Sequence, residues 1–383
     1  MYRLNPEQAA IVERARQIAE REIGPRADRV DAEGVFPTES IEALAKEGFL
    51  GLTVSPDHGG MGQGLRVTSA VLDEIAQRCA STAMIYLMHL CGVACYSAAA
   101  EKTASLLRAA ARGDHLSTLA WSERGSRSHF WAPVSQAVAQ NGQVAISAEK
   151  SWVTSAGHAD GYVVSTRWNE AREPLETMLY LVLREDAGLS VAGPWSALGM
   201  RGNASAPMRL ANVAVGEDRA LSTAGQGFAM MLGVVLPVFQ LGNAAVGIGL
   251  AEAAVQATQR HLTGSRFEHL GSKLADLPTL RARLAEMRIA TDQARAHLVA
   301  VIDAVENPGP TTTLLVLEVK AAASEAAVRV TDLGMRACGG AAFSKHLGLE
   351  RYFRDARAAI VMAPTSDQAY DFIGRALCGM ELF

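Results

Sequence analysis

The chain has 383 residues, 49% hydrophobic and 20% charged, which is an ordinary balance for a packed globular protein. Its formal net charge of −4 gives no electrostatic reason to expect a nucleic-acid partner or an anionic membrane surface. Charged residues interrupt the long apolar runs, so we expect no membrane span, and the polar N-terminus does not resemble a signal peptide. Five cysteines without a Cys-x-x-Cys pair favour neither a disulfide framework nor a metal site, and they are typical of a reducing cytoplasm.

The first third of the sequence predicts helices. Asn5 is a favourable N-cap, Pro6 follows at the first helical position, and Gln8 is placed to close a capping box. A second helix is expected over 38–47, and Gly48 should end it. Further helices are expected over 66–78, 81–100 and 102–112, which together make an N-terminal helical domain of residues 1–115.

The central third changes to short runs rich in Val, Tyr, Trp and Thr, separated by Gly, Asn or charged clusters. This pattern predicts an antiparallel β-barrel or sandwich domain of residues 116–224. The expected strands lie at 116–122, 134–139, 144–148, 152–154, 162–167 and 177–184.

The last part, residues 225–383, predicts a helical bundle. Apolar residues recur by three and four over 280–305, and the sequence Asn-Pro-Gly-Pro at 307–310 should break that helix before the next one at 311–334. Helices, then strands, then helices, without βαβ alternation, predict an α+β multi-domain protein with no parallel sheet.

Two segments of the central domain carry residues suited to ligand binding. A strand runs into the loop 122–128, whose hydroxyls, glycine and arginines can bind an anion or a ring carbonyl, although a polar β-turn has the same composition. Trp152 offers a flat face for stacking, and Thr154 offers a hydroxyl beside it. The alternative for Trp152 is an aromatic side chain in the β-domain core.

The loop 122–128 resembles the Thr-Glu-Pro-x-x-Gly-Ser-Asp motif of the acyl-CoA dehydrogenase family. Arg124 replaces the proline of the motif, Arg127 replaces its glycine, and His129 replaces its aspartate. The resemblance implies that Ser122 contacts the flavin ring of FAD and that Ser128 binds an FAD phosphate. The segment 150–155 resembles the family's Lys-x-Trp-Ile-Thr-Asn, which implies that Trp152 and Thr154 also contact the flavin.

Further matches lie in the C-terminal part. The segment beginning at Arg266 resembles the family's Arg-x-x-Phe-Gly, and Gly339-Gly340 resembles its Gly-Gly-x-Gly-Phe turn. The resemblance implies that Arg266, Gly339 and Gly340 meet the FAD of a partner subunit. It also implies that Thr365 and Asp367 contact the adenine end of the cofactor.

The position of the family's catalytic base is occupied by an alanine. The stretch 354–367 resembles Arg-Asp-Ala followed by an apolar run and Tyr-Glu-Gly-Thr-Ser, but Ala363-Pro364 replaces Glu-Gly. Relatives of the isovaleryl type carry the glutamate on a bundle helix, and the matching position here is Pro237. His89, in a helix that lines the substrate cavity in the family, is a candidate base, with a hydrogen-bonded core histidine as the alternative.

The resemblance spans nearly the whole chain and implies an N-terminal helical domain, a central β-domain and a C-terminal four-helix bundle. FAD should lie between the β-domain and the bundle of a homodimer or homotetramer, with an electron-transfer partner. The leading function is an FAD-dependent oxidoreductase that acts on an acyl thioester, such as an acyl-CoA, or a related carbonyl compound. The alternatives are a flavin-dependent monooxygenase of the same fold, which oxidises sulfur or nitrogen and needs no α-proton base, and a non-enzymatic flavin-retaining subunit.

Overall fold

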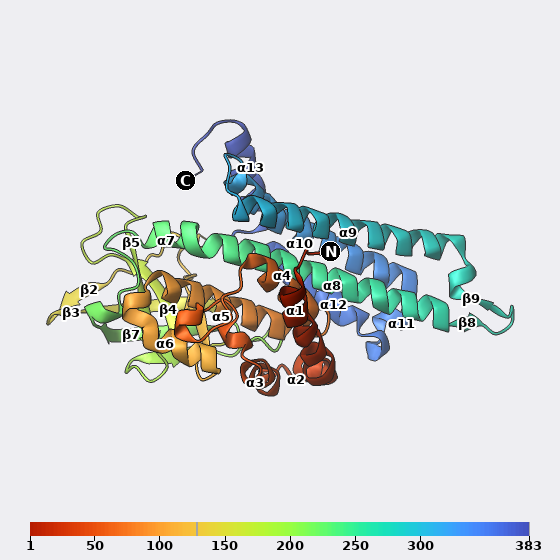
Figure 1. The fold of residues 1–383 in the computed structure, drawn as a ribbon, viewed down its shortest axis with the longest axis horizontal. Coiled ribbons are helices and arrows are strands. Elements are labelled where there is room, and N and C mark those ends of the chain that lie inside the picture. The colour runs from red at the N-terminus through yellow and green to blue at the C-terminus, as the bar shows by residue number, and fades with distance from the viewer. Residues whose placement is uncertain (128, 383) are drawn as a thin grey trace.

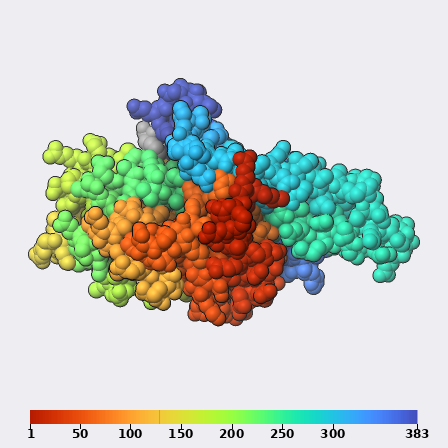
Figure 2. Space-filling model, viewed as in Figure 1, coloured from red at the N-terminus to blue at the C-terminus, as the bar shows by residue number. Residues whose placement is uncertain are grey.

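The computed structural model describes residues 1–127 and 129–382. The molecule is elongated, with a β-domain at one end and a helical bundle along its long axis (Figure 1). The N-terminal residues lie at the middle of the visible face, between the β-domain and the far end of the bundle (Figure 2). The predicted order of helices, strands and helices is confirmed.

The expected N-terminal helices are present with bounds within two residues of those predicted, whereas α2 was not predicted. The side chain of Asn5 accepts the backbone N–H of Gln8, and the side chain of Gln8 accepts the backbone N–H of Asn5, so the predicted capping box is confirmed. Gly48, after the third helix, has a φ of 78°, a left-handed conformation that favours glycine. The helices are α1 Pro6–Ile18, α2 Ala27–Glu33, α3 Thr38–Lys46, α4 Leu65–Ala76, α5 Ala80–Ala98 and α6 Ala100–Arg112.

The β-domain has two sheets, one in the order β1-β4-β5 and one in the order β2-β3-β7-β6. Two expected strands, 144–148 and 152–154, are parts of one long strand, β3, whose pairing with β7 shifts register at two irregular points. The sequence analysis did not predict β6 or β7. The strands are β1 Ser117–Ala120, β2 Val138–Gln140, β3 Gln143–Val153, β4 Gly161–Arg167, β5 Thr177–Leu183, β6 Leu189–Val191 and β7 Ala206–Val215.

One strand pair corrects the expectation that no strands run parallel. β1 pairs with β4 in parallel, with Ser117 opposite Gly161 and Ala120 opposite Val164, whereas the other strand pairs are antiparallel. Between β1 and β4 the chain passes through β2 and β3 of the other sheet. This excursion lets the chain re-enter the first sheet in the same direction, as a parallel pair requires.

The C-terminal part is built on long helices that run along the molecule (Figure 1). The break predicted at 307–310 is confirmed, because α9 ends at Glu306 and α10 starts at Thr312. A small hairpin, β8–β9, caps the far end. The elements are α7 Gly227–Met230, α8 Leu236–Gly264, β8 Arg266–Phe267, β9 Ser272–Lys273, α9 Pro278–Glu306, α10 Thr312–Cys338, α11 Gly340–Phe343, α12 Leu349–Val361 and α13 Ser366–Leu377.

Two helical stretches correct the statement that no segment is long and apolar enough for a membrane span. Ala80–Ala98 and Gly227–Gly264 pass that test by length and hydropathy, but 83% and 61% of their most apolar windows are buried. A core helix that packs on all sides is hydrophobic all round, as a membrane span is. We therefore interpret both stretches as core helices.

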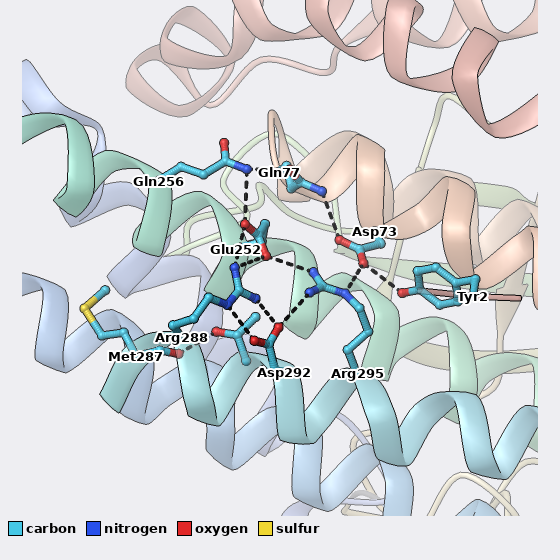
Figure 3. Close-up of polar contacts among 10 residues, drawn as sticks. Tyr2, Asp73, Gln77, Glu252, Gln256, Met287, Arg288, Asp292 and Arg295 are labelled. Carbon is cyan, nitrogen blue, oxygen red and sulfur yellow. Dashed lines mark hydrogen bonds and ion pairs between the residues drawn. The ribbon is translucent and has the colours of Figure 1, made fainter. Parts of the chain in front are cut away.

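A buried polar network joins the N-terminal helices to the bundle (Figure 3). The Asp73 carboxylate on α4 accepts the hydroxyl of Tyr2 at 2.8 Å, the amide of Gln77 at 3.0 Å and Nε of Arg295 at 3.1 Å. Arg295, on α9, also donates to Glu252 of α8 at 3.1 Å. Because both charges of the Asp73–Arg295 pair are buried, each depends on the other for compensation.

Candidate functional site

A cavity of about 910 Å³, cavity 1, lies where the N-terminal helices, the β-domain and the bundle meet. Its wall is mainly apolar, aromatic and sulfur-containing, as is typical of sites that bind small organic ligands. The lining includes Met84 and Met88 of α5, Trp121, Phe130, Trp152 and Trp195 of the β-domain, and Met231, Phe239, Val361 and Met362 of the C-terminal part.

Trp152 lies in the wall of cavity 1 with 67% of its surface exposed, so the alternative of a core aromatic is wrong. Its φ of 60° is strained for a bulky residue, and Arg127 and Met200 of the same lining have φ values of 44° and 49°. Its indole makes a T-shaped contact with Trp195, with 5.9 Å between ring centroids. Strained residues of this kind concentrate at ligand sites, where the surrounding structure holds them in place.

Two hydroxyl-bearing residues beside Trp152 also line cavity 1. The Thr154 hydroxyl is 2.9 Å from the Ser205 hydroxyl. The backbone carbonyl of Thr154 accepts a hydrogen bond from the hydroxyl of Thr118 at 2.8 Å. Ser122 holds the neighbouring strand by accepting the backbone N–H of Ser151 at 2.9 Å. The Ser122 hydroxyl has no hydrogen-bond partner among the described residues, so it is available to a ligand.

The loop after Ser122 is anchored by a buried ion pair. The carboxylate of Glu123 accepts Lys150 Nζ at 2.7 Å and the backbone N–H groups of Val134 and Ser135 at 2.8 and 2.9 Å. Burial alone would raise the pKa of Glu123, but the ammonium and these donors hold it below its ordinary value. Glu123 is therefore an ionised anchor for the loop. The predicted phosphate ligand Ser128 lies outside the described residues.

The segment 361–363 forms the side of cavity 1 where the family's base is expected. Ala363 lines the cavity there. Lys320, from α10, donates to the backbone carbonyls of Met362 at 2.9 Å and Pro364 at 2.7 Å, and so holds this wall from behind. Pro237, the alternative family position, is the second residue of α8 and is not part of the described lining.

Cavity 1 has an unusual charge balance. Among the described lining residues Glu123 is the only carboxylate, and Lys150 already compensates it. The described lining cations are Arg124, Arg127, Arg354 and Arg357. No described lining residue therefore offers a free carboxylate for proton abstraction.

The Arg-Asp-Ala motif at 354–356 holds the wall of cavity 1 together. Arg354 binds both carboxylate oxygens of Asp31, at 2.8 and 2.6 Å. Asp355 accepts the backbone N–H of Met200 at 2.6 Å and fixes that strained residue against α12. Burial raises the pKa of Asp355 to about 6. These contacts give the motif a positioning function.

His89 does not reach cavity 1, which corrects its candidacy as a base. The side chain is fully buried, Nε2 lies 2.7 Å from the carbonyl of Leu50, and Nδ1 accepts the backbone N–H of Ser117 at 3.1 Å. Burial lowers the pKa of His89 to about 4. The structure therefore agrees with the alternative, a hydrogen-bonded core histidine.

The other predicted cofactor residues lie away from cavity 1. Arg266 is on the β8–β9 hairpin, Gly339 follows the end of α10, and Gly340 begins α11; all three are exposed, on the part of the bundle farthest from the β-domain (Figure 1). Thr365 caps α13 by accepting the backbone N–H of Gln368 at 3.2 Å. Asp367 is exposed in the first turn of α13. Within one subunit these residues do not join the wall of cavity 1.

Several wall residues were not singled out from the sequence. Met84 and Met88 are one helical turn apart on α5, a spacing that equally indicates core packing. Trp195 and Ser205 lie in 186–205, where the sequence analysis expected no element. Lys320 lies within an apolar helix, and an isolated cation at a core position is the signal that would have identified it.

Comparisons with known proteins agree with this arrangement. Three family profiles match in succession: acyl-CoA dehydrogenase N-terminal domain over 5–114, middle domain over 118–213 and C-terminal domain over 225–378. Cyclohex-1-ene-1-carbonyl-CoA dehydrogenase of Geobacter metallireducens is 27% identical, over 98% of this chain and 99% of the relative.

Two solved structures have the same fold. Butyryl-CoA dehydrogenase from Megasphaera elsdenii is 20% identical with a TM-score of 0.92, over 98% of this chain and 99% of the other. PigA with FAD and proline is 18% identical with a TM-score of 0.91, over 99% of both chains. From these matches and the preceding geometry, the chain belongs to the acyl-CoA dehydrogenase family of flavoprotein oxidoreductases.

Proposed function

We propose that this chain is an FAD-dependent oxidoreductase that takes the acyl part of a thioester, or a related carbonyl compound, into cavity 1. Bound FAD would supply the acceptor for the hydride that leaves the substrate's β-carbon. The observation that carries the proposal is Trp152, whose exposed indole and strained backbone lie in the wall of a mainly apolar cavity. The relative named above acts, by its name, on a CoA thioester.

The residues around Trp152 fit a flavin ring. The indole offers an uncovered face for stacking, and the free hydroxyl of Ser122 offers a hydrogen bond to a ring edge. The Glu123–Lys150 pair keeps the loop that carries Ser122 in place. Thr154 lies in the same wall and shares a hydroxyl contact with Ser205. We assign Ser122, Trp152 and Thr154 to the cofactor.

The described lining bears on the substrate class. An ordinary thioester α-proton is weakly acidic and requires a positioned base, yet Glu123 is the only described carboxylate in the lining and is compensated by Lys150. A thioester with an α-aryl group needs a weaker base, because its α-carbanion is conjugated with the ring. Trp121, Phe130 and Phe239 would pack against such a ring. We therefore favour thioesters with an activated α-hydrogen.

The same observation favours a second candidate, a flavin-dependent monooxygenase. Oxidation of sulfur or nitrogen removes no α-proton, so it does not need a carboxylate at Ala363. The match to PigA, whose structure holds FAD and proline, shows the fold alone. The two functions differ in what the reduced protein does with oxygen and in which compounds reduce it.

The oligomeric state is a further proposal. Arg266, Gly339 and Gly340 are exposed away from cavity 1, as expected if they complete the cofactor site of another subunit. Closed symmetric assemblies are the usual form of soluble oligomers. We expect the FAD-loaded protein to be a homodimer or homotetramer at micromolar concentration in light scattering. A clean FAD-loaded monomer would contradict this assignment.

We further propose a reducing location and a partner. All five cysteines are free, and Cys378 is exposed, which suits the cytoplasm. A dehydrogenase that keeps its reduced flavin away from oxygen needs an electron-transfer protein to reoxidise it. We expect such a partner to contact the surface near Trp152, the exposed end of the cofactor site.

Anaerobic mixing with a thioester panel tests the function. The FAD-loaded protein should lose its yellow colour faster with 2-phenylbutanoyl-CoA than with butyryl-CoA or octanoyl-CoA. If no thioester bleaches the flavin, and the reduced protein oxidises a thiol or an amine in air, the monooxygenase function replaces the dehydrogenase. If the protein binds no flavin, both the dehydrogenase and the monooxygenase function are wrong.

A further inference from the structure

One lining cation of cavity 1, Arg357, has no ion pair in the described part of the chain and no expected contact with the cofactor. Of the other described lining arginines, Arg354 binds the carboxylates of Asp31 and Glu350, each at 2.6 Å. The remaining two lie on the expected flavin loop 122–128, where FAD phosphates would compensate their charge. Arg357 is therefore the lining cation that is left for the substrate.

Neutral neighbours hold Arg357 in place. Its Nη1 donates to the backbone carbonyl of Phe353 and to the hydroxyl of Thr331 at 3.2 Å, and its guanidinium stacks on the Phe353 ring. Its Nε and Nη2 donate to no described residue. The charge of Asp332 acts on Arg357, but Asp332 is already paired with Arg336 at 2.7 Å. The guanidinium thus presents two free donors in a fixed plane, an arrangement that suits a carboxylate.

Arg357 lies on the same wall of cavity 1 as Ala363. Arg357 and Val361 are one turn apart at the end of α12, and Met362 and Ala363 continue the lining beyond it. In the family, the base at the position of Ala363 acts on the α-carbon of the substrate. A substituent on that carbon would therefore extend along the wall that carries Arg357.

We infer that cavity 1 accepts a thioester with a carboxylate on its α-carbon, an alkylmalonyl thioester, and that Arg357 binds this carboxylate. The inference rests on the proposed function of an FAD-dependent oxidoreductase and adds a substrate class to it. It accounts for both charge features of cavity 1, a cation without an ion pair and the lack of a free carboxylate among the described lining residues.

In such a substrate the loss of CO2 replaces the loss of a proton. The bond between the α-carbon and the carboxylate breaks, CO2 leaves, and the electron pair stays on the α-carbon beside the thioester carbonyl. A hydride then leaves the β-carbon for the oxidised flavin, and the electron pair on the α-carbon forms the new double bond. The products are CO2, an α,β-unsaturated thioester and reduced flavin, and no protein group has to accept a proton.

The apolar side chains beside Arg357 favour this step. Val361 and Met362 line the same wall. As CO2 leaves, the negative charge spreads from a compact carboxylate into the thioester. A compact anion loses more solvation than a dispersed one in apolar surroundings, so the wall opposes the starting carboxylate more than the carbanion. Arg357 supplies the affinity that brings the carboxylate there.

Binding is tested with malonyl-CoA and acetyl-CoA, which cannot reduce the flavin because neither has a hydrogen-bearing β-carbon. In calorimetry, the FAD-loaded wild type should bind malonyl-CoA about 10-fold more tightly than acetyl-CoA, as expected for one charge-assisted contact. Arg357→Gln should bind both equally, and Arg357→Lys should keep part of the preference. Arg172→Gln is the matched control with wild-type preference, since Arg172 is exposed on the β-domain and does not line cavity 1.

Turnover tests the chemistry. In anaerobic mixing, ethylmalonyl-CoA should bleach the wild-type flavin faster than butyryl-CoA does. Each reduced flavin should be accompanied by one released CO2, and the product should be crotonyl-CoA. An unsaturated product that keeps its carboxylate would overturn the decarboxylation, because its formation requires removal of the α-proton.

Other results would overturn the site itself. Equal affinities of the wild type for malonyl-CoA and acetyl-CoA would do so. Loss of FAD from both Arg357→Gln and Arg357→Lys would assign the guanidinium to the cofactor instead. If 2-phenylbutanoyl-CoA still bleaches the wild-type flavin after such a result, the proposed function stands without this substrate class. If no thioester bleaches it, both proposals fail.

Discussion

At the scale of single residues, Trp152 carries most of the argument for a cofactor. Its side chain is exposed in a cavity wall, and its φ of 60° costs about 1–2 kcal/mol relative to an ordinary backbone conformation. Backbone strain of this kind persists where the surrounding structure enforces it, and such residues cluster at ligand sites. The sequence motif pointed to Trp152, but the backbone strain is visible only in the structure, because φ depends on the surrounding contacts.

Trp152→Ala should weaken FAD binding by roughly 1–3 kcal/mol, because it removes a large aromatic stacking face. Fluorescence titration of the apoprotein with FAD measures the dissociation constant. Trp152→Phe keeps a smaller ring, so its dissociation constant for FAD should lie between those of the wild type and Trp152→Ala. Unchanged FAD affinity in Trp152→Ala would remove Trp152 from the cofactor site.

Lys320 gives a pH-dependent prediction. Burial lowers its pKa from an ordinary 10.5 to about 7, so between about pH 7 and 10 the unfolded chain binds a proton that the folded chain does not. The free energy of unfolding should then rise with pH in this range, by at most about 1.4 kcal/mol per unit from this group. Below about pH 7 both states bind the proton, so this group no longer contributes to the slope. Lys320→Met should flatten that rise.

Urea unfolding at pH 6, 7, 8 and 9 gives the slope for each variant. Lys345→Met serves as the control, because Lys345 is exposed and should leave the slope as in the wild type. The absolute stability of Lys320→Met should also fall, since the carbonyls of Met362 and Pro364 lose their donor. Parallel pH profiles for the wild type and Lys320→Met would show that Lys320 does not titrate in this range.

At the scale of elements, the Asp73–Arg295 pair links α4 to α9 (Figure 3). Asp73→Asn should lower the free energy of unfolding by about 3–5 kcal/mol, because it removes a charge partner from a buried guanidinium. Asp292→Asn is the matched change on the exposed edge of the network and should cost less than about 1 kcal/mol. Urea denaturation measures the free energy of unfolding of both variants. Equal small losses in the two would show that the buried pair does not stabilise the fold.

Elements defined by local signals could be predicted from the sequence, and those defined by distant partners could not. The capping box at Asn5 needs four consecutive residues, and the break after Glu306 needs one proline-rich turn. Strand β7 is recognised by its pairing with β3, whose paired residues lie 53 to 71 positions earlier in the chain, and the register shifts disturb the alternation along it. The parallel β1–β4 pair likewise depends on the path of the intervening chain.

At the scale of the whole molecule, cavity 1 exists because three separate parts of the chain meet. Family motifs singled out Ser122, Trp152, Thr154 and Ala363 in the sequence, and all four line its wall. Motifs did not identify Lys320 behind that wall. Its position within an apolar helix marks it as unusual, but its partners, the carbonyls of Met362 and Pro364, are far away in sequence and are known only from the structure.

The most direct test of the account is the rate of anaerobic flavin bleaching by butyryl-CoA in the wild type and in Ala363→Glu/Pro364→Gly. The glycine lets the new side chain follow the family backbone, although a carboxylate in this mainly apolar wall has an unfavourable solvation energy. We predict slow or absent bleaching in the wild type and an increase of roughly 10²–10⁴-fold in the variant, the contribution of a placed general base. Rapid bleaching of the wild type by butyryl-CoA, with no gain in the variant, would contradict the claim that the missing carboxylate at Ala363 limits the oxidation of ordinary acyl thioesters.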